Sequence, residues 1–203
     1  MKKRLLVFDM DGTLYRQNSP RNTYAGSRLE ETVNQNARNL ILRRGWADES
    51  TVDIVMQEGL VDTIGLSNYF QSNFNITRSE YFKEVWDINP EGMLKDYKVA
   101  KEVMQTLAET NTLILLTSAP KVWQQQVCNY LGIRNLFDRV ITGEQFCKKD
   151  EIFKQLSRKY NSSNAISIGD QLQTDILPAT KYGFQTLLVK KPRDLQRLLK
   201  EQL

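Results

Sequence analysis

Histidine is missing from this sequence of 203 residues, and its absence excludes several kinds of catalytic site. Ser-His-Asp and Cys-His sites need an imidazole as the proton acceptor. Zinc sites built on histidine ligands, and phosphotransfer through histidine, need the same side chain. Any chemistry in this chain must therefore depend on carboxylates, hydroxyls and lysines.

Cysteines and long apolar segments are also scarce. The only two cysteines, Cys128 and Cys147, are too few and too widely spaced for a disulfide framework. The apolar run that follows the basic start ends at Asp9, too early for the core of a signal peptide. No stretch is long enough to cross a membrane as a helix. We therefore expect a cytoplasmic protein without a membrane partner.

Neither charge sign dominates the sequence. The 28 lysines and arginines exceed the 24 acidic residues by only four, and the excess is spread thinly along the chain. No basic stretch is interleaved with aromatic residues, a pattern typical of nucleic-acid-binding surfaces. We expect a small anionic substrate, no nucleic-acid partner, and a monomer or weak homodimer.

Short, continuously apolar runs alternate with helical patterns over most of the chain. A run that stops at a turn signal, such as Arg4 to Asp9 before Asp11-Gly12, is typical of a strand buried on both faces. Similar strands are expected at Leu113–Leu116, Arg139–Thr142, Ala165–Ile168 and Thr186–Val189, with helical spacing at Val99–Leu107, Val122–Leu131, Ile152–Tyr160 and in the tail from Asp194. This alternation predicts an α/β fold with a Rossmann-like parallel sheet and helices on both faces.

The alternation is interrupted between Tyr15 and about Lys95. Apolar residues there have helical spacing, at Val33, Ala37, Leu40 and Ile41 and again at Val52, Val55 and Met56, and no buried strand occurs. A structureless loop of this length is uncommon in a compact domain. We therefore expect residues 16–92 to form an inserted α-helical cap domain, and residues 1–15 and 93–203 to form the core.

Polar and acidic residues follow the expected strands. Asp9 and Asp11 end the first, Thr117 and Ser118 the second, and Gly169-Asp170 the fourth, with Asp175 five residues later. Ligands of open parallel sheets gather at the carboxyl ends of the strands. Asp9, Asp11 and Asp170 brought together there would repel one another unless a cation were bound, and oxygen ligands suit Mg²⁺.

These residues resemble the motifs of the haloacid dehalogenase superfamily. The resemblance consists of Asp-Met-Asp-Gly-Thr at 9–13, Thr117-Ser118 at a strand end, a lysine near 148, and Gly-Asp-x-x-x-x-Asp at 169–175. Four elements in this order cover essentially the whole core and are far more specific than one short motif. The resemblance implies a hydrolase with a helical cap inserted after the first strand.

The resemblance also implies a role for each motif residue. Asp9 would be the nucleophile and a metal ligand, and Asp11 the general acid and base, with its main-chain oxygen on the metal. Asp170 would complete the metal site, while Asp175 would hold a metal-bound water or orient the loop. Thr117 or Ser118 would bind phosphoryl oxygens.

The expected active-site lysine departs from the commonest family pattern. Many relatives have Lys-Pro-Asp-Pro before the helix, whereas this chain has Lys148-Lys149-Asp150-Glu151. We favour Lys148 over Lys149 as the lysine that neutralises Asp9 and the phosphoryl group, with Asp150 as the N-cap of the helix. Ser118 also stands where the family has an asparagine.

The residues favour hydrolysis of a phosphate monoester. Asp11 supplies the proton that an ester's leaving group needs, and dehalogenases of this scaffold lack such an aspartate. A phosphomutase of the same family is an alternative, although its cap usually contributes a histidine. A catalytically inactive binding protein with the same fold is a second alternative.

A weaker likeness suggests the substrate. Leu14-Tyr15-Arg16 and Gln57-Glu58-Gly59-Leu60 resemble the pyrimidine 5′-nucleotidase and phosphoglycolate phosphatase-like branch. This likeness implies a nucleoside monophosphate or a sugar phosphate, with Tyr15, Arg16 and Glu58 near the leaving group. Tyr15 would stack on a base or simply pack at the hinge.

Overall fold

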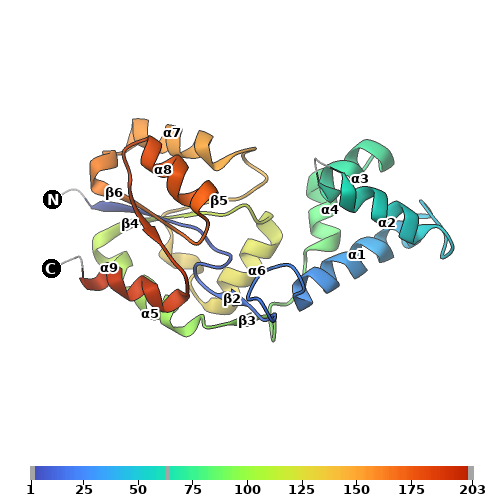
Figure 1. Ribbon diagram of the computed structural model, residues 1–203, viewed down its shortest axis with the longest axis horizontal. Coiled ribbons are helices and arrows are strands. Elements are labelled where there is room, and N and C mark those ends of the chain that lie inside the picture. The colour runs from blue at the N-terminus through green and yellow to red at the C-terminus, as the bar shows by residue number, and fades with distance from the viewer. Residues whose placement is uncertain (1–2, 63–64, 201–203) are drawn as a thin grey trace.

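The computed structural model describes residues 3–62 and 65–200, and a five-stranded parallel sheet forms its core (Figure 1). The strands are β1 (Arg4–Phe8), β4 (Asn111–Leu116), β5 (Arg139–Ile141), β6 (Ala165–Gly169) and β7 (Gln185–Leu188). Their order, β5-β4-β1-β6-β7, places β1 at the centre. The predicted α/β fold with a Rossmann-like parallel sheet is confirmed.

The two faces of the sheet are covered by different helices, because alternate side chains of a strand point to opposite faces. In β1, Leu6 and Phe8 pack on one face, and Leu5 and Val7 pack on the other. Helices α5 (Lys98–Thr110), α6 (Lys121–Leu131) and α9 (Arg197–Lys200) cover the first face, and α7 (Lys149–Lys159) and α8 (Leu177–Lys181) cover the second. Burial on both faces explains why the strands are continuously apolar.

The inserted segment 16–92, called the cap below, leaves and rejoins the core through two short strands. These strands, β2 (Arg16–Gln17) and β3 (Leu94–Lys95), pair in an antiparallel ribbon. Between them lie α1 (Arg28–Arg44), α2 (Val52–Val61), α3 (Leu66–Phe74) and α4 (Arg78–Val85), which Figure 1 shows to one side of the sheet. The division of the chain into domains at residues 15/16 and 92/93 stays a prediction.

Among the cap helices that the structure describes, α3 and α4 were not expected from apolar spacing. Helix α4 begins at a capping box in which Thr77 and Glu80 satisfy each other's backbone N–H groups. Helix α3 contributes Phe70, which is buried against the ring of Tyr81 from α4 at a centroid distance of 5.0 Å. Aromatic packing thus joins the helices of the cap.

Within the described residues, no helix is both long enough and apolar enough to cross a membrane.

Candidate active site

The loop after β1 holds Asp9 at the carboxyl edge of the sheet. Asp9 is only 8% exposed, and its backbone N–H donates to the Ile168 oxygen of β6 at 2.8 Å. The Thr13 hydroxyl donates to Asp9 Oδ2 at 3.2 Å. Gly12 has φ +85°, and a Cβ atom there would clash with the carboxyl group of Asp170. Glycine therefore allows the loops after β1 and β6 to approach closely.

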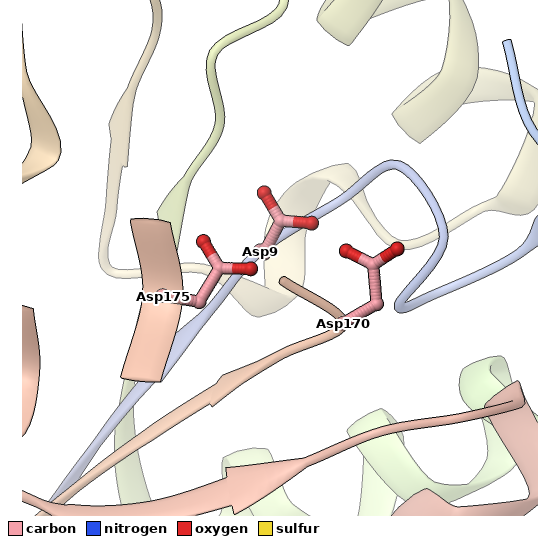
Figure 2. Close-up of side chains that lie close together, drawn as sticks. All are labelled: Asp9, Asp170 and Asp175. Carbon is pink, nitrogen blue, oxygen red and sulfur yellow. The ribbon is translucent and has the colours of Figure 1, made fainter. Parts of the chain in front are cut away.

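Three carboxyl groups meet at this edge. Figure 2 shows Asp9 and Asp170 on the loops that follow β1 and β6, and Asp175 on the helical segment that comes next. Each of the three offers an oxygen, and these oxygens lie within 4.8 Å of one another. Asp175 belongs to a π-helical turn, η3 (Leu172–Ile176), and its Oδ2 accepts from the Gln171 N–H at 3.0 Å. Of the three carboxylates expected to converge, Asp9 and Asp170 belong to this group, but its third member is Asp175 and not Asp11.

A buried lysine links two of the carboxylates. Lys149 Nζ lies 2.6 Å from Asp9 Oδ1 and 2.6 Å from Asp175 Oδ1, and its side chain is only 6% exposed. Lys148, which the sequence analysis favoured, is exposed and occupies the N-cap position of α7 in an extended conformation. The preference for Lys148 was therefore wrong, because Lys149 is the first residue of α7 and points its side chain at the strand ends.

The expected cap of α7 also differs. Asp150 lies in the first turn rather than at the N-cap, and its carboxylate accepts from Tyr182 at 2.8 Å and Lys181 at 3.0 Å.

Asp11 is held by a different set of partners. Its carboxylate accepts hydrogen bonds from the Tyr15 hydroxyl, from Trp123 Nε1 at 3.3 Å and from the Thr117 hydroxyl at 3.4 Å. Burial and the neighbouring Asp11 raise the pKa of Tyr15 well above its usual range, so the phenol remains a donor. Trp123, on α6, was missed in the sequence because an indole donor has no motif of its own. The two aspartates of the motif are therefore held in separate networks.

Thr117 and Ser118 are placed differently from each other. Thr117 is buried, and its hydroxyl accepts from the Ala119 N–H at 3.0 Å while donating to Asp11. Ser118 is exposed and lines the cavity beside Asp11. Of the two expected phosphate-binding hydroxyls, Ser118 has the more accessible position.

The electrostatics of the cluster favour a bound cation. Burial raises the pKa of Asp9 to about 7, although Lys149 opposes the shift and the Asp175 charge adds to it. Burial and Asp175 raise the pKa of Asp170 to about 6. Burial alone would lower the pKa of Lys149, but the charges of Asp9 and Asp175 outweigh it and raise that pKa. One lysine therefore faces more negative charge than it can neutralise.

One buried oxygen also lacks a partner. Asp170 Oδ1 makes no hydrogen bond within the described part of the chain. Buried polar atoms are nearly always paired with protein, water or an ion. The carboxylates of Asp9 and Asp170 and the main-chain oxygen of Asp11 are donors of the type that Mg²⁺ prefers, so the residues present fit this ion.

A cavity of about 360 Å³ lies beside Asp11 and Asp170 and extends towards the cap. Asp11, Gly12, Asp170, Gln171 and Ser118 line its core end. Its other lining residues are Gln17, Asn22, Thr23, Tyr24, Leu29, Phe82, Trp86, Ala119, Pro120 and Trp123. The cap residues of this set were not predicted; the only sequence signal was the pair Phe82 and Trp86, four residues apart on one helical face.

The three residues that were predicted near the leaving group lie elsewhere. Tyr15 is fully buried and acts on Asp11 instead of facing a substrate. Arg16 donates to the main-chain oxygen of Lys190. Glu58 is exposed on α2 and accepts from the Tyr69 hydroxyl at 2.7 Å. None of them lines the 360 Å³ cavity, so their expected placement beside the leaving group is corrected.

Solved structures resemble the whole chain. A HAD phosphatase from Thermococcus onnurineus is 19% identical over 98% of both chains, with a TM-score of 0.65. A 2-haloacid dehalogenase from Pseudomonas syringae pv. Tomato DC3000 is 15% identical over 100% of both chains, with a TM-score of 0.63. A HAD family enzyme from Bacteroides thetaiotaomicron, in complex with magnesium and inorganic phosphate, is 16% identical over 97% of this chain and 98% of its own, with a TM-score of 0.56. At these identities the likeness concerns the fold alone.

No curated protein matched the sequence. The model of the haloacid dehalogenase-like hydrolases, in contrast, matches residues 3–183. This match includes the two aspartates after β1, the buried lysine of α7 and the acidic pair after β6. The chain therefore belongs to the haloacid dehalogenase-like hydrolase family.

Proposed function

We propose that this hydrolase is a magnesium-dependent phosphatase that releases phosphate from a small monoester through an aspartyl phosphate at Asp9. The observation that carries the proposal is the separation of two neighbouring carboxylates. Asp9 is paired with Lys149 at 2.6 Å, whereas Asp11 is held by Tyr15, Trp123 and Thr117 at the edge of the cavity. Two carboxyl groups in different surroundings can serve as nucleophile and as acid.

In the first step, an Asp9 oxygen attacks phosphorus and the bond from phosphorus to the ester oxygen breaks. Asp11 gives its proton to that departing oxygen, so an alcohol leaves. Burial raises the pKa of Asp11, which favours the protonated form that this step requires. Lys149 offsets the negative charge of Asp9 and of the phosphoryl group.

In the second step, a water molecule attacks the phosphorus of the aspartyl phosphate. Asp11, now ionised, takes a proton from this water, and the bond between Asp9 and phosphorus breaks. Inorganic phosphate and the starting forms of both aspartates result. The hydrogen bonds that hold Asp11 in place serve both proton transfers.

Asp9, Asp170 and the main-chain oxygen of Asp11 would hold Mg²⁺, with Asp175 beside them. A bound Mg²⁺ supplies positive charge that stabilises the phosphoryl oxygens. The unpartnered Asp170 Oδ1 supports this assignment.

We propose a nucleoside monophosphate or a sugar phosphate as the substrate class, in the cytoplasm, with no nucleic-acid or membrane partner and with a monomer or weak homodimer as the working form. The 360 Å³ cavity suits a leaving group of this size. Phosphomutases of the family usually place a histidine and a lysine in the cap. No lysine is among the residues described as lining the cavity, which favours hydrolysis.

Release of inorganic phosphate from nucleoside monophosphates and sugar phosphates tests the proposal. Turnover should need Mg²⁺ and should fall by at least 1000-fold, as is typical when a nucleophile is lost, in Asp9→Asn. Asp53→Asn, on the exposed face of α2, is the matched control and should keep full activity. A folded native chain that releases no phosphate from any ester, or an Asp9→Asn variant that keeps its turnover, would refute the mechanism.

A further inference from the structure

Three aromatic side chains are shared by the linings of two neighbouring cavities. Tyr24, Phe82 and Trp86 line both the 360 Å³ cavity at the catalytic carboxylates and a second cavity of about 260 Å³ farther into the cap. The rings of Tyr24 and Trp86 are nearly parallel, with an interplanar angle of 13° and centroids 5.9 Å apart. Tyr24 is 37% exposed, so part of its ring is accessible to a ligand. Such a surface offers a flat face to a bound molecule.

The described lining of the 360 Å³ cavity carries no positively charged side chain. No lysine or arginine is among the residues described as lining it, and its only charged side chains are Asp11 and Asp170. In the second cavity, the one charged residue in the described lining is Glu30. A carboxylate or second phosphate on the leaving group would therefore be bound without a compensating cation, which is costly. The chemistry of the walls favours an uncharged leaving group.

A buried amide supplies a polar contact. Gln17 of β2 lines the first cavity and is only 3% exposed. Its Oε1 makes no hydrogen bond to any of the described residues. A buried acceptor without a partner is costly and calls for a donor. Because Gln17 lines the cavity, a hydroxyl or N–H group of a bound molecule can be that donor.

The geometry points to a specificity site in which Tyr24 and Trp86 stack against an uncharged aromatic ring of the leaving group while Gln17 accepts a hydrogen bond from it. The substrate class is therefore a phosphate monoester of a base-bearing alcohol, such as a nucleoside, in preference to a plain sugar or a hydroxy acid. This inference rests on the proposed phosphatase function for its biological meaning. The binding preference itself can be tested without turnover.

Three probes separate the contributions to binding. Uridine 5′-monophosphate and ribose 5-phosphate differ in the base, and 3-phosphoglycerate carries a carboxylate instead. Affinities are measured by calorimetry in Mg²⁺ buffer on Asp9→Asn, which is expected not to hydrolyse its ligand. The nucleotide should bind roughly tenfold more tightly than ribose 5-phosphate, because stacking of a base on an aromatic side chain is worth about this factor or more. 3-Phosphoglycerate should bind most weakly.

Variants then assign the preference to residues. In the Asp9→Asn background, Tyr24→Ala or Trp86→Ala should remove most of the tenfold preference for the nucleotide and leave ribose 5-phosphate binding within twofold. Tyr24→Phe should restore the preference, because it keeps the ring. Tyr130→Ala is the control: this ring is similarly exposed, at 40%, but pairs with Tyr97 on the core away from the cavity.

Gln17→Leu separates a ligand contact from a structural role. Because the buried Oε1 of Gln17 has no partner among the described residues, its removal should leave the thermal midpoint unchanged or raise it, whereas affinity for the nucleotide should fall several-fold. A fall in the midpoint with unchanged affinity would mean that Gln17 is structural and would overturn its part of the inference.

The two hypotheses fail in different ways. Equal affinity for the nucleotide and ribose 5-phosphate, or tighter binding of 3-phosphoglycerate, overturns the specificity site even if the native enzyme releases phosphate. Absence of phosphate release from every ester refutes the phosphatase, whereas the binding ratios still decide the specificity site.

Discussion

Replacement of Lys149 by methionine tests the central ion-pair cluster. Lys149 is 6% exposed and lies 2.6 Å from both Asp9 and Asp175, and methionine keeps most of its length without the charge. Removal of one partner from a buried ion pair typically costs about 3–5 kcal/mol, because the remaining charge has no compensation. A carboxyl group that takes up a proton avoids part of this cost. We therefore expect the free energy of unfolding to fall by about 3 kcal/mol at pH 7.5 without metal.

The loss should depend on pH and on magnesium. Without Lys149 the ionised carboxylates are less favourable in the folded state, so their folded pKa values rise. The folded variant then binds more protons than the unfolded chain above the ordinary carboxyl pKa, and its stability falls as pH rises. The difference from the native chain should be small near pH 4.5 and largest near pH 7.5. Mg²⁺ bound beside Asp9 should recover part of it.

Urea unfolding at both pH values, with EDTA or with Mg²⁺, measures these differences. Lys148→Met is the matched control, because Lys148 is the exposed neighbour, and it should change stability by less than about 0.5 kcal/mol. Phosphate release should fall at least 100-fold in Lys149→Met, since a charge-assisted contact to nucleophile and phosphoryl group is lost, and should be unchanged in Lys148→Met. The opposite ranking of the two variants would refute the assignment of Lys149.

Three further perturbations test other parts of the site. Affinity for Mg²⁺ should fall on the order of 100-fold from pH 7.5 to 5.5, because the metal must displace protons from Asp9 and Asp170, whose pKa values are about 7 and 6. Calorimetry that shows the same affinity at both pH values would contradict the assigned ligands. Gly12→Ala should lower the free energy of unfolding by at least about 1 kcal/mol and weaken Mg²⁺ binding, because φ at Gly12 is +85° and the new methyl group would clash with Asp170. Equal urea midpoints for the variant and the native chain would contradict the expected loss of stability. Trp123→Phe should slow the hydrolysis of esters with poor leaving groups more than that of p-nitrophenyl phosphate, because only poor leaving groups depend on the proton of Asp11. Equal slowing of both kinds of ester would mean that Trp123 does not position the acid.

The core could be predicted from the sequence because its signals are local. Each buried strand is a short apolar run, and parallel strands bring their carboxyl ends to one edge, so Asp9 and Asp170 are brought together by topology alone. The choice between Lys148 and Lys149 was beyond such reasoning. Both are lysines at the start of one helix, and only the position where α7 begins decides which side chain points at Asp9.

The cap illustrates the opposite case. Tyr24 lies in a loop before α1 and stacks on Trp86, which caps the end of α4 more than sixty residues later. No spacing rule links the two positions, because their contact depends on how four helices pack. Trp123 likewise comes from α6 to donate to Asp11, which follows β1. The proposed specificity site rests on contacts of this kind, so the substrate was the part least visible in the sequence.

The structure also explains how two aspartates separated by one residue can differ in chemistry. Met10 between them is fully buried, and the loop bends so that Asp9 faces Lys149 while Asp11 faces Trp123. Burial raises the pKa of both carboxyl groups, but a lysine 2.6 Å away opposes the shift directly at Asp9, whereas Asp11 is stabilised mainly by neutral hydrogen-bond donors and feels the Lys149 charge more weakly. The proposed difference between nucleophile and acid therefore depends on the elements that surround the motif, α7 for Asp9 and α6 for Asp11, together with Thr13 and Tyr15 of the same segment. A chain that kept Asp-x-Asp but lost Lys149 and Trp123 would keep the family signature without the charge separation that the proposed reaction needs.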